Sequence, residues 1–103
     1  MMKKLIYTPE AVRQLKSVKT YISDALHNSK AANDIVGKIT AGCRLLLEFP
    51  EMGRSVNLID DGTLARLLIV DNYIIIYDVT DDAVRIISIE DARSDWASYF
   101  IRL

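Results

Sequence analysis

Three apolar runs in the second half of the chain constrain the fold more strongly than any single motif. They are TLARLLIV from Thr63, YIIIYDV from Tyr73 and AVRIISIE from Ala83, and they are rich in β-branched and aromatic residues. In the first two runs, both faces of the expected strand are apolar, whereas an antiparallel sheet with helices on one side normally turns polar residues to solvent. The sequence therefore predicts an antiparallel sheet that is covered on both faces.

Short polar segments between these runs determine the expected strand pairing. A two-residue turn at Asp71-Asn72 places Arg66 opposite Tyr77 on neighbouring strands. A four-residue turn after the second run places Asp78 opposite Arg85, where the two side chains can form a cross-strand ion pair. We therefore expect three consecutive antiparallel strands joined as a meander.

The first half of the chain has the apolar period of helices. The run KKLIY is expected to form a strand, and Thr8-Pro9-Glu10 then combines an N-cap residue, a first-turn proline and an acid near the helix start. Apolar residues recur at three- and four-residue steps in two nearly contiguous helices, the first ending near His27-Asn28. The second is expected to start with Ser29 as its cap and to stop near Pro50. The short connection predicts an antiparallel helix hairpin packed on the sheet.

Two further segments link the hairpin to the sheet and close the chain. In LLLEFPEMGR, Gly53 lets the chain turn into the sheet, and we expect Arg54 to fix this joint through backbone carbonyls. The tail DARSDWASYFIRL is expected to form a short C-terminal helix that covers part of the open sheet face, with a partner chain covering the rest. The apolar face of this tail consists of Ala92, Trp96, Tyr99, Phe100 and Leu103.

Length and composition favour one α+β domain over residues 1–103 and argue against several kinds of protein. The formal net charge of −1 supplies no overall basic field for nucleic acid. The one cysteine, Cys43, lies on a helix stripe and is expected to be a buried thiol, and no spacing of metal or cofactor ligands is seen. No apolar run has the length of a signal peptide or a membrane span, so we expect a cytoplasmic protein without a membrane partner.

The order and spacing of these segments resemble the RelE/ParE superfamily of type II toxin–antitoxin toxins, and the ParE (plasmid stabilisation) branch more than the RelE branch. The resemblance covers nearly the whole chain and rests on YTPEAVRQLKSVKTYI, LLLEFPEMGR, RLLIVDNYIIIYDV and VRIISIEDARSD. It implies an N-terminal strand, an antiparallel helix hairpin packed on an antiparallel β-meander, and a short C-terminal helix. It also implies a toxin that inhibits growth by binding DNA gyrase, that needs no cofactor, and that a cognate antitoxin neutralises.

Residues of the strands and the tail are the expected contacts to a target or partner. They are Arg66, Arg93, Trp96, Tyr99 and Phe100. Each also has a structural interpretation. Arg66 can bond Tyr77 and fix the sheet, Arg93 can be a solvated arginine beside nearby acids, and Trp96 and Phe100 can simply pack on the sheet.

A ribosome-dependent mRNA endonuclease of the RelE kind is the alternative, with the ribosome and mRNA as partners. Arg66, Arg85 and Arg93 would then supply cations, and Tyr99 lies six residues beyond Arg93, a spacing that the RelE branch also uses. Against it, Ile74 stands where nuclease members carry an arginine after the first strand tyrosine, and the net charge does not suit ribosomal RNA. A non-toxic interaction module of the same fold is the third interpretation. The sequence leaves open whether the chain forms a homodimer or a toxin–antitoxin hetero-oligomer.

Overall fold

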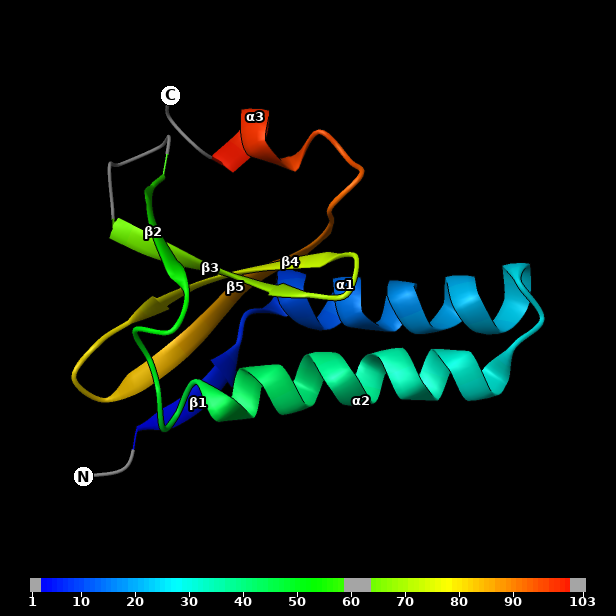
Figure 1. The fold of residues 1–103 in the computed structure, drawn as a ribbon, viewed down its shortest axis with the longest axis horizontal. Helices are drawn as coiled ribbons and strands as arrows, with labels where there is room; N and C mark the ends of the chain where they lie inside the picture. The colour runs from blue at the N-terminus through cyan, green and yellow to red at the C-terminus, as the bar shows by residue number, and fades with distance from the viewer. Residues whose placement is uncertain (1–2, 59–63, 101–103) are drawn as a thin grey trace.

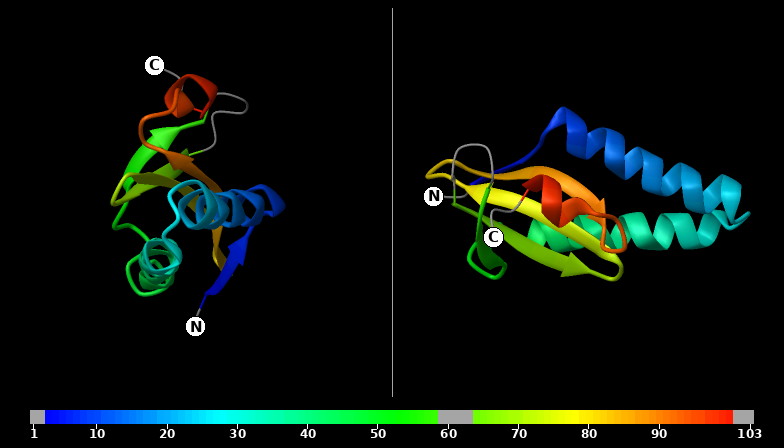
Figure 2. Two further views of the ribbon diagram at one scale, coloured as in Figure 1. Left: turned by 90° about the vertical axis from the view of Figure 1, so that its right-hand side faces the viewer. Right: turned by 90° about the horizontal axis from the view of Figure 1, so that it is seen from above.

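The computed structural model describes residues 3–58 and 64–100, which form three layers (Figure 1). A helix hairpin lies on one face of a sheet and a short C-terminal helix lies across the other face, as the two further views in Figure 2 also show. The elements are β1 (Lys4–Tyr7), α1 (Pro9–Thr20), the π-helical turn η1 (Tyr21–Ala25), α2 (Ser29–Leu45), β2 (Arg54–Asn57), β3 (Leu64–Val70), β4 (Tyr73–Val79), β5 (Ala83–Asp91) and α3 (Trp96–Phe100). The α+β arrangement predicted from the sequence is confirmed. No helix within the described ranges is long and apolar enough to cross a membrane.

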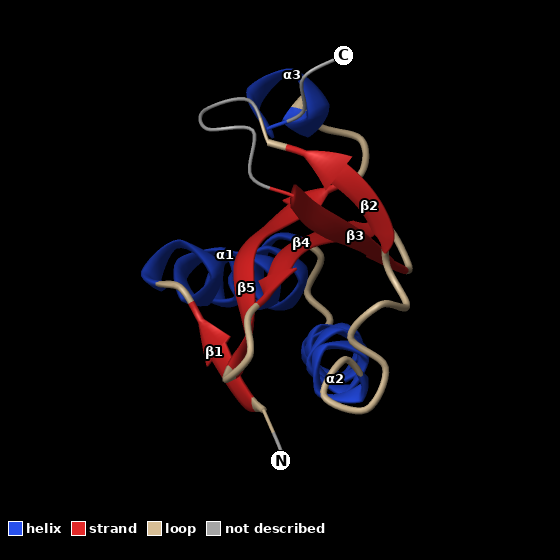
Figure 3. Ribbon diagram, turned by 90° about the vertical axis from the view of Figure 1, so that its left-hand side faces the viewer, coloured by secondary structure: helices blue, strands red, loops and turns tan. Residues whose placement is uncertain are grey.

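The sheet has the strand order β1-β5-β4-β3-β2 within the described residues (Figure 3). Strands β2 to β5 form an antiparallel meander, and both predicted registers are confirmed, with Arg66 opposite Tyr77 and Asp78 opposite Arg85. Two features were not predicted. Strand β1 pairs with β5 in parallel, so the sheet is mixed, and the polar segment Arg54–Asn57 forms an edge strand through its pairing with β3.

Side-chain caps begin both helices of the hairpin. The Thr8 hydroxyl accepts from the Ala11 N–H (3.1 Å) and donates to the Ile87 carbonyl (2.8 Å), so the cap of α1 is also tied to β5. Asn28 caps α2 by accepting from the Ala31 N–H (3.0 Å); this corrects the expectation for Ser29, which is the first helical residue. The turn between the helices passes through His27, whose φ of 52° ends the first helical segment where the sequence predicted.

The main core fills the space between the hairpin and the sheet. Its buried members are Ala11, Ile39, Cys43, Leu46, Ile75, Tyr77, Val84, Ile86 and Ile89. Cys43 is fully buried, as predicted, and burial raises the pKa of its thiol, so the thiol stays protonated at neutral pH. Burial likewise raises the pKa of Tyr7, whose hydroxyl lies against Cys43.

The opposite face of the sheet is covered in part by the chain itself. Its buried centre is formed by Ala65, Ile74 and Ile76, and the side chains packed on it are Val56, Leu58, Leu67, Ile87, Trp96 and Phe100. Trp96 and Phe100 therefore supply the cover that the sequence predicted for the tail. Ala92 and Tyr99, expected on the same face, are exposed instead, and Leu103 lies outside the described residues. Ile74 and Ile76 are therefore buried within the chain, whereas Ile69, which lies opposite Ile74 on β3, is 69% exposed. Cover of the rest of this face by a partner chain stays a prediction.

The joint between α2 and β2 is fixed by two side chains of the sheet. The Tyr77 hydroxyl accepts from the Gly53 N–H (2.8 Å) and donates to the Pro50 carbonyl (2.8 Å). One Arg66 nitrogen, Nη1, donates to the carbonyls of Gly53 (2.7 Å) and Glu51 (3.2 Å). Four hydrogen bonds thus converge on the segment Pro50–Gly53, and Tyr77, the residue that makes two of them, is fully buried.

Gly53 is required where the joint meets the sheet. A Cβ at this position would lie 2.5 Å from the Tyr77 hydroxyl oxygen and 2.6 Å from the Leu67 carbonyl oxygen. The side chain that binds the joint carbonyls is Arg66. Arg54, for which the sequence predicted this role, stands exposed at the start of β2 opposite Leu67.

We expect the change Tyr77→Phe to lower the free energy of unfolding by about 1–3 kcal/mol, because it leaves the Gly53 N–H and the Pro50 carbonyl without their partner. Urea unfolding followed by circular dichroism measures this change. Tyr99→Phe is the matched control, since the Tyr99 side chain is 74% exposed, and we expect it to leave stability unchanged. Equal unfolding midpoints for Tyr77→Phe and the parent chain would show that the joint does not depend on this hydroxyl.

Candidate functional site

The three arginines that the sequence singled out are held in three separate interactions. Arg66 binds the joint carbonyls, as described above. Arg85 pairs with Asp78, with 3.1 Å between Nε and Oδ1, which confirms the predicted cross-strand ion pair. Arg93 pairs with Asp91, with 2.9 Å between Nη2 and Oδ2. Arg85 and Asp91 are six residues apart on β5, about 20 Å along a strand, so these arginines do not surround one reaction centre.

The tail residues divide into packing and exposed side chains. Trp96 and Phe100 are partly buried and pack on the outer face of the sheet. Tyr99, between them on α3, is 74% exposed. The structural interpretation therefore fits Trp96 and Phe100, whereas Tyr99 is available for contact with another molecule.

A turn built on Asp91 fixes the direction in which the tail leaves β5. Asp91 Oδ1 accepts from the backbone N–H of Arg93 (2.8 Å) and from its Nε (3.1 Å). The Asp91 carbonyl accepts from the N–H (3.0 Å) and hydroxyl (2.7 Å) of Ser94, while the Ala92 N–H donates to the Asn72 carbonyl (2.7 Å). The hydrogen bonds from Arg93 lower the pKa of Asp91, and the same carboxylate raises the pKa of Arg93. Both groups are charged at neutral pH, so the turn is held by an ion pair.

Two surface cavities meet at this turn. Their volumes are about 430 and 380 Å³, and both are lined by Tyr21, Tyr73, Asp91 and Arg93. One continues along α1, and the other continues toward the end of the helix hairpin and the β3–β4 turn. Burial raises the pKa of Tyr73 and Tyr21 is 53% exposed, so the site offers a protonated phenol, an exposed ring and a guanidinium within one concave surface. Tyrosine and arginine are, with tryptophan, enriched among the residues that carry most of the binding energy at protein interfaces.

The two tyrosines of β4 are poorly suited to act as general bases. Burial raises the pKa of both Tyr73 and Tyr77, so neither phenol is ready to act as a general base near neutral pH. The Tyr77 hydroxyl is already committed to the joint. In residues 3–58 and 64–100, no three His, Cys, Asp or Glu side chains are grouped to hold a metal ion.

Of the four residues that line both cavities, sequence reasoning missed three as site residues, namely Tyr21, Tyr73 and Asp91. Asp91 precedes Arg93 by two positions, and an aspartate that bonds a backbone N–H two residues later is a recognisable turn signal. Tyr21 has no comparable signal, because it reaches the cavity from the π-helical turn η1, which the apolar period of the sequence does not distinguish from an α-helix.

Comparison with known proteins gives a family and a fold. The family model described as the ParE toxin of the type II toxin–antitoxin system, parDE, matches residues 5–96, which include the joint and Arg93. Among solved structures, the chain is similar to one described as the chromosomal ParDE TA system from P. aeruginosa. The TM-score is 0.72 at 17% identity, and the alignment covers 89% of this chain and 98% of that chain. At this identity the likeness shows the fold alone. Curated protein sequences give no match.

We expect the change Asp91→Asn to loosen the tail at neutral pH, because the amide loses the ion pair with Arg93 that fixes the turn. Trp96 is the one tryptophan of the chain and packs on the sheet, so its fluorescence emission reports the docking of α3. The emission of the variant should shift to the red.

The parent chain should show the same red shift only in acid. The pKa of Asp91 is lowered in the folded state, so the contribution of the carboxylate is present above the ordinary aspartate pKa and is lost as the pH falls through the lowered one. Asp95→Asn is the control, because the hydrogen bond at Asp95 uses its backbone carbonyl. Identical emission from Asp91→Asn and the parent at neutral pH would contradict the role given to this turn.

Proposed function

The chain belongs to the ParE toxin family of type II toxin–antitoxin systems, and we propose that it inhibits growth by binding DNA gyrase and is neutralised by a cognate antitoxin. The observation that carries this proposal is the family match, which spans residues 5–96. The match includes the hairpin and the four residues that line both cavities, Tyr21, Tyr73, Asp91 and Arg93, which we call the Arg93 surface. Action on gyrase implies that the protein works in the cytoplasm. The proposed mechanism is contact with the target, without cofactor or metal.

The proposed contact with the target is the surface around the turn where the tail leaves β5. Arg93 and Tyr99 are exposed there, and Tyr21 lines the cavities beside Arg93. Of the other residues predicted to contact a partner, Arg66 holds the joint, and Trp96 and Phe100 anchor the tail. In this proposal those three are positioning residues, because they act through the elements they fix.

The separation of the cationic side chains favours contact over RNA cleavage. An endonuclease needs a base, cations and a proton donor around one phosphate. Arg66, Arg85 and Arg93 are held in three different interactions. The net charge of −1 likewise gives no general attraction to ribosomal RNA. The nuclease and the non-toxic interaction module are therefore kept as outcomes of the test.

The proposed partner is an antitoxin encoded by a reading frame adjacent to this one. The similar solved structure is described as a toxin–antitoxin system, which supports a partner of this kind. Expression of the chain with and without its neighbour tests the whole proposal. We expect growth arrest with filamentation and an induced DNA-damage response, all suppressed by the neighbour, and inhibition of purified gyrase in a supercoiling assay. Rapid arrest of translation with cut messages would instead establish the nuclease, and unaffected growth would establish the non-toxic module.

We expect Arg93→Ala to reduce gyrase inhibition and toxicity about tenfold, because it removes an exposed guanidinium from the proposed contact. The measurement is the concentration of purified variant that inhibits supercoiling by half, beside the level of expression that arrests growth. Arg13→Ala is the matched control, since Arg13 is also an exposed, paired arginine but lies on α1. Full inhibition by Arg93→Ala, with the fold intact by circular dichroism, would remove Arg93 from the contact surface.

A further inference from the structure

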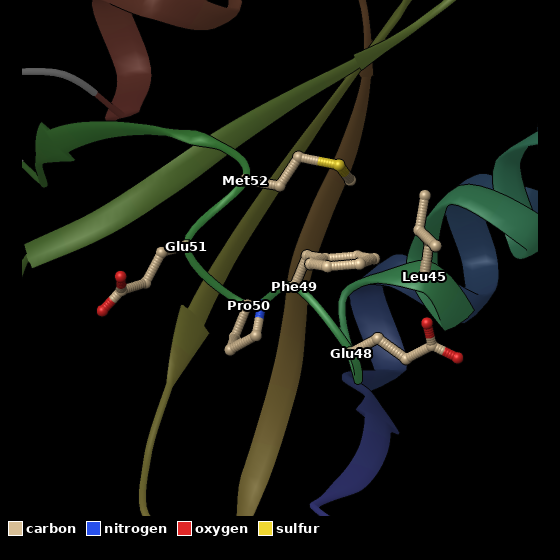
Figure 4. Close-up of a pocket in the computed structure, with 6 residues that line it drawn as sticks. All are labelled: Leu45, Glu48, Phe49, Pro50, Glu51 and Met52. Carbon is tan, nitrogen blue, oxygen red and sulfur yellow. The ribbon is translucent and has the colours of Figure 1, made fainter.

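An apolar groove lies at the joint between α2 and β2. It has a volume of about 620 Å³ and is lined by Leu45, Glu48, Phe49, Pro50, Glu51 and Met52; we call it the joint groove. Leu45, Phe49 and Met52 are 43%, 56% and 43% exposed. Figure 4 shows these three side chains turned toward the same open space, while the carboxylates of Glu48 and Glu51 point away on opposite sides. Three large apolar side chains thus gather on one concave surface without a cover in the described chain.

The joint groove is held in one conformation by the network beneath it. Tyr77 and Arg66 bind the backbone of Pro50–Gly53, which forms one wall. The Phe49 N–H donates to the Leu45 carbonyl (3.0 Å), and the Met52 N–H donates to the Phe49 carbonyl (3.1 Å). A buried polar network therefore fixes a segment whose apolar side chains face solvent. Such a preformed apolar surface binds a partner without first having to order its own backbone.

The charges around the joint groove are negative, which indicates the charge of the segment that would bind there. Glu48 and Glu51 are the charged residues that line it, and the C-terminal end of α2, which carries partial negative charge, lies beside them. The nearby Arg44 does not line the groove. Its charge acts instead on Tyr7, where it partly offsets the rise in pKa that burial causes. A complementary occupant therefore combines apolar anchors with a lysine or arginine. A second copy docked groove to groove would bring carboxylates of both copies together, so a symmetric self-contact is disfavoured.

We propose that the joint groove is the docking site of one amphipathic segment of the antitoxin. Apolar side chains of that segment, spaced three or four residues apart, enter between Leu45, Phe49 and Met52. A flanking lysine or arginine meets Glu48 or Glu51. This inference rests on the proposed function and adds to it a binding surface separate from the Arg93 surface, because the two sets of lining residues share no member.

The test measures affinity for the purified, full-length product of the adjacent reading frame by isothermal titration. We expect Phe49→Glu to weaken this affinity at least tenfold while growth inhibition in the absence of the neighbour stays at the parent level. The double change Glu48→Lys with Glu51→Lys should weaken affinity severalfold and reverse its salt dependence, without altering the apolar side chains. Val12→Glu is the matched control, since Val12 is 38% exposed on α1, and it should leave affinity within a factor of about two.

Each outcome decides the inference. If the parent chain and Phe49→Glu bind the neighbouring product with equal affinity, and both are folded by circular dichroism, the joint groove is not the docking site. The toxin–antitoxin function would still stand. Conversion of a dimer to a monomer by Phe49→Glu, with antitoxin binding unchanged in sedimentation experiments, identifies a self-interface and likewise overturns the inference. A parent chain that neither arrests growth nor binds the neighbouring product overturns the proposed function, and the inference falls with it.

Discussion

The buried hydroxyl of Tyr77 is the interaction on which the arrangement of the layers depends. It lies on the central strand β4 and binds both ends of the joint that leads from the helix hairpin into the sheet. Loss of this hydroxyl would leave the Gly53 N–H and the Pro50 carbonyl without a partner at the border between the two layers. The requirement for glycine at position 53 has the same origin, since this oxygen occupies the space that a Cβ would need. One side chain therefore fixes the chain direction and the residue type at the joint.

The outer face of the sheet and the joint differ in how far the chain covers their apolar side chains. On its outer face, the tail brings Trp96 and Phe100 over Ile74 and Ile76, so these two side chains are buried within the chain, while Ile69 on the same face stays exposed. At the joint, the network of Tyr77 and Arg66 binds only backbone atoms, so the side chains of Phe49 and Met52 remain outside. The two proposed binding surfaces thus lie at the joint and at the point where the tail leaves β5.

Local patterns in the sequence predicted the elements that local chemistry determines. The turn at Asp71-Asn72 fixed the register of Arg66 with Tyr77, and the apolar period predicted the helix hairpin. Apart from the cap of α2, which is Asn28 in place of the neighbouring Ser29, what failed depends on contacts far apart in the chain. Strand β2 forms from a polar segment only because β3 pairs with it, and the joint is held by Arg66 because strand pairing carries that side chain to it. The cavity beside Arg93 likewise combines η1 with β4 and β5, which no local pattern brings together.

Native-state hydrogen exchange of the Gly53 amide tests this account most directly. The amide belongs to a surface joint, but its N–H donates to a buried hydroxyl 2.8 Å away. The account predicts that it exchanges only through global unfolding, with the same protection as the amide of Ile75 in the central strand. Exchange at the rate of an open loop would contradict a joint held by Tyr77, and with it the rigid groove that the joint displays.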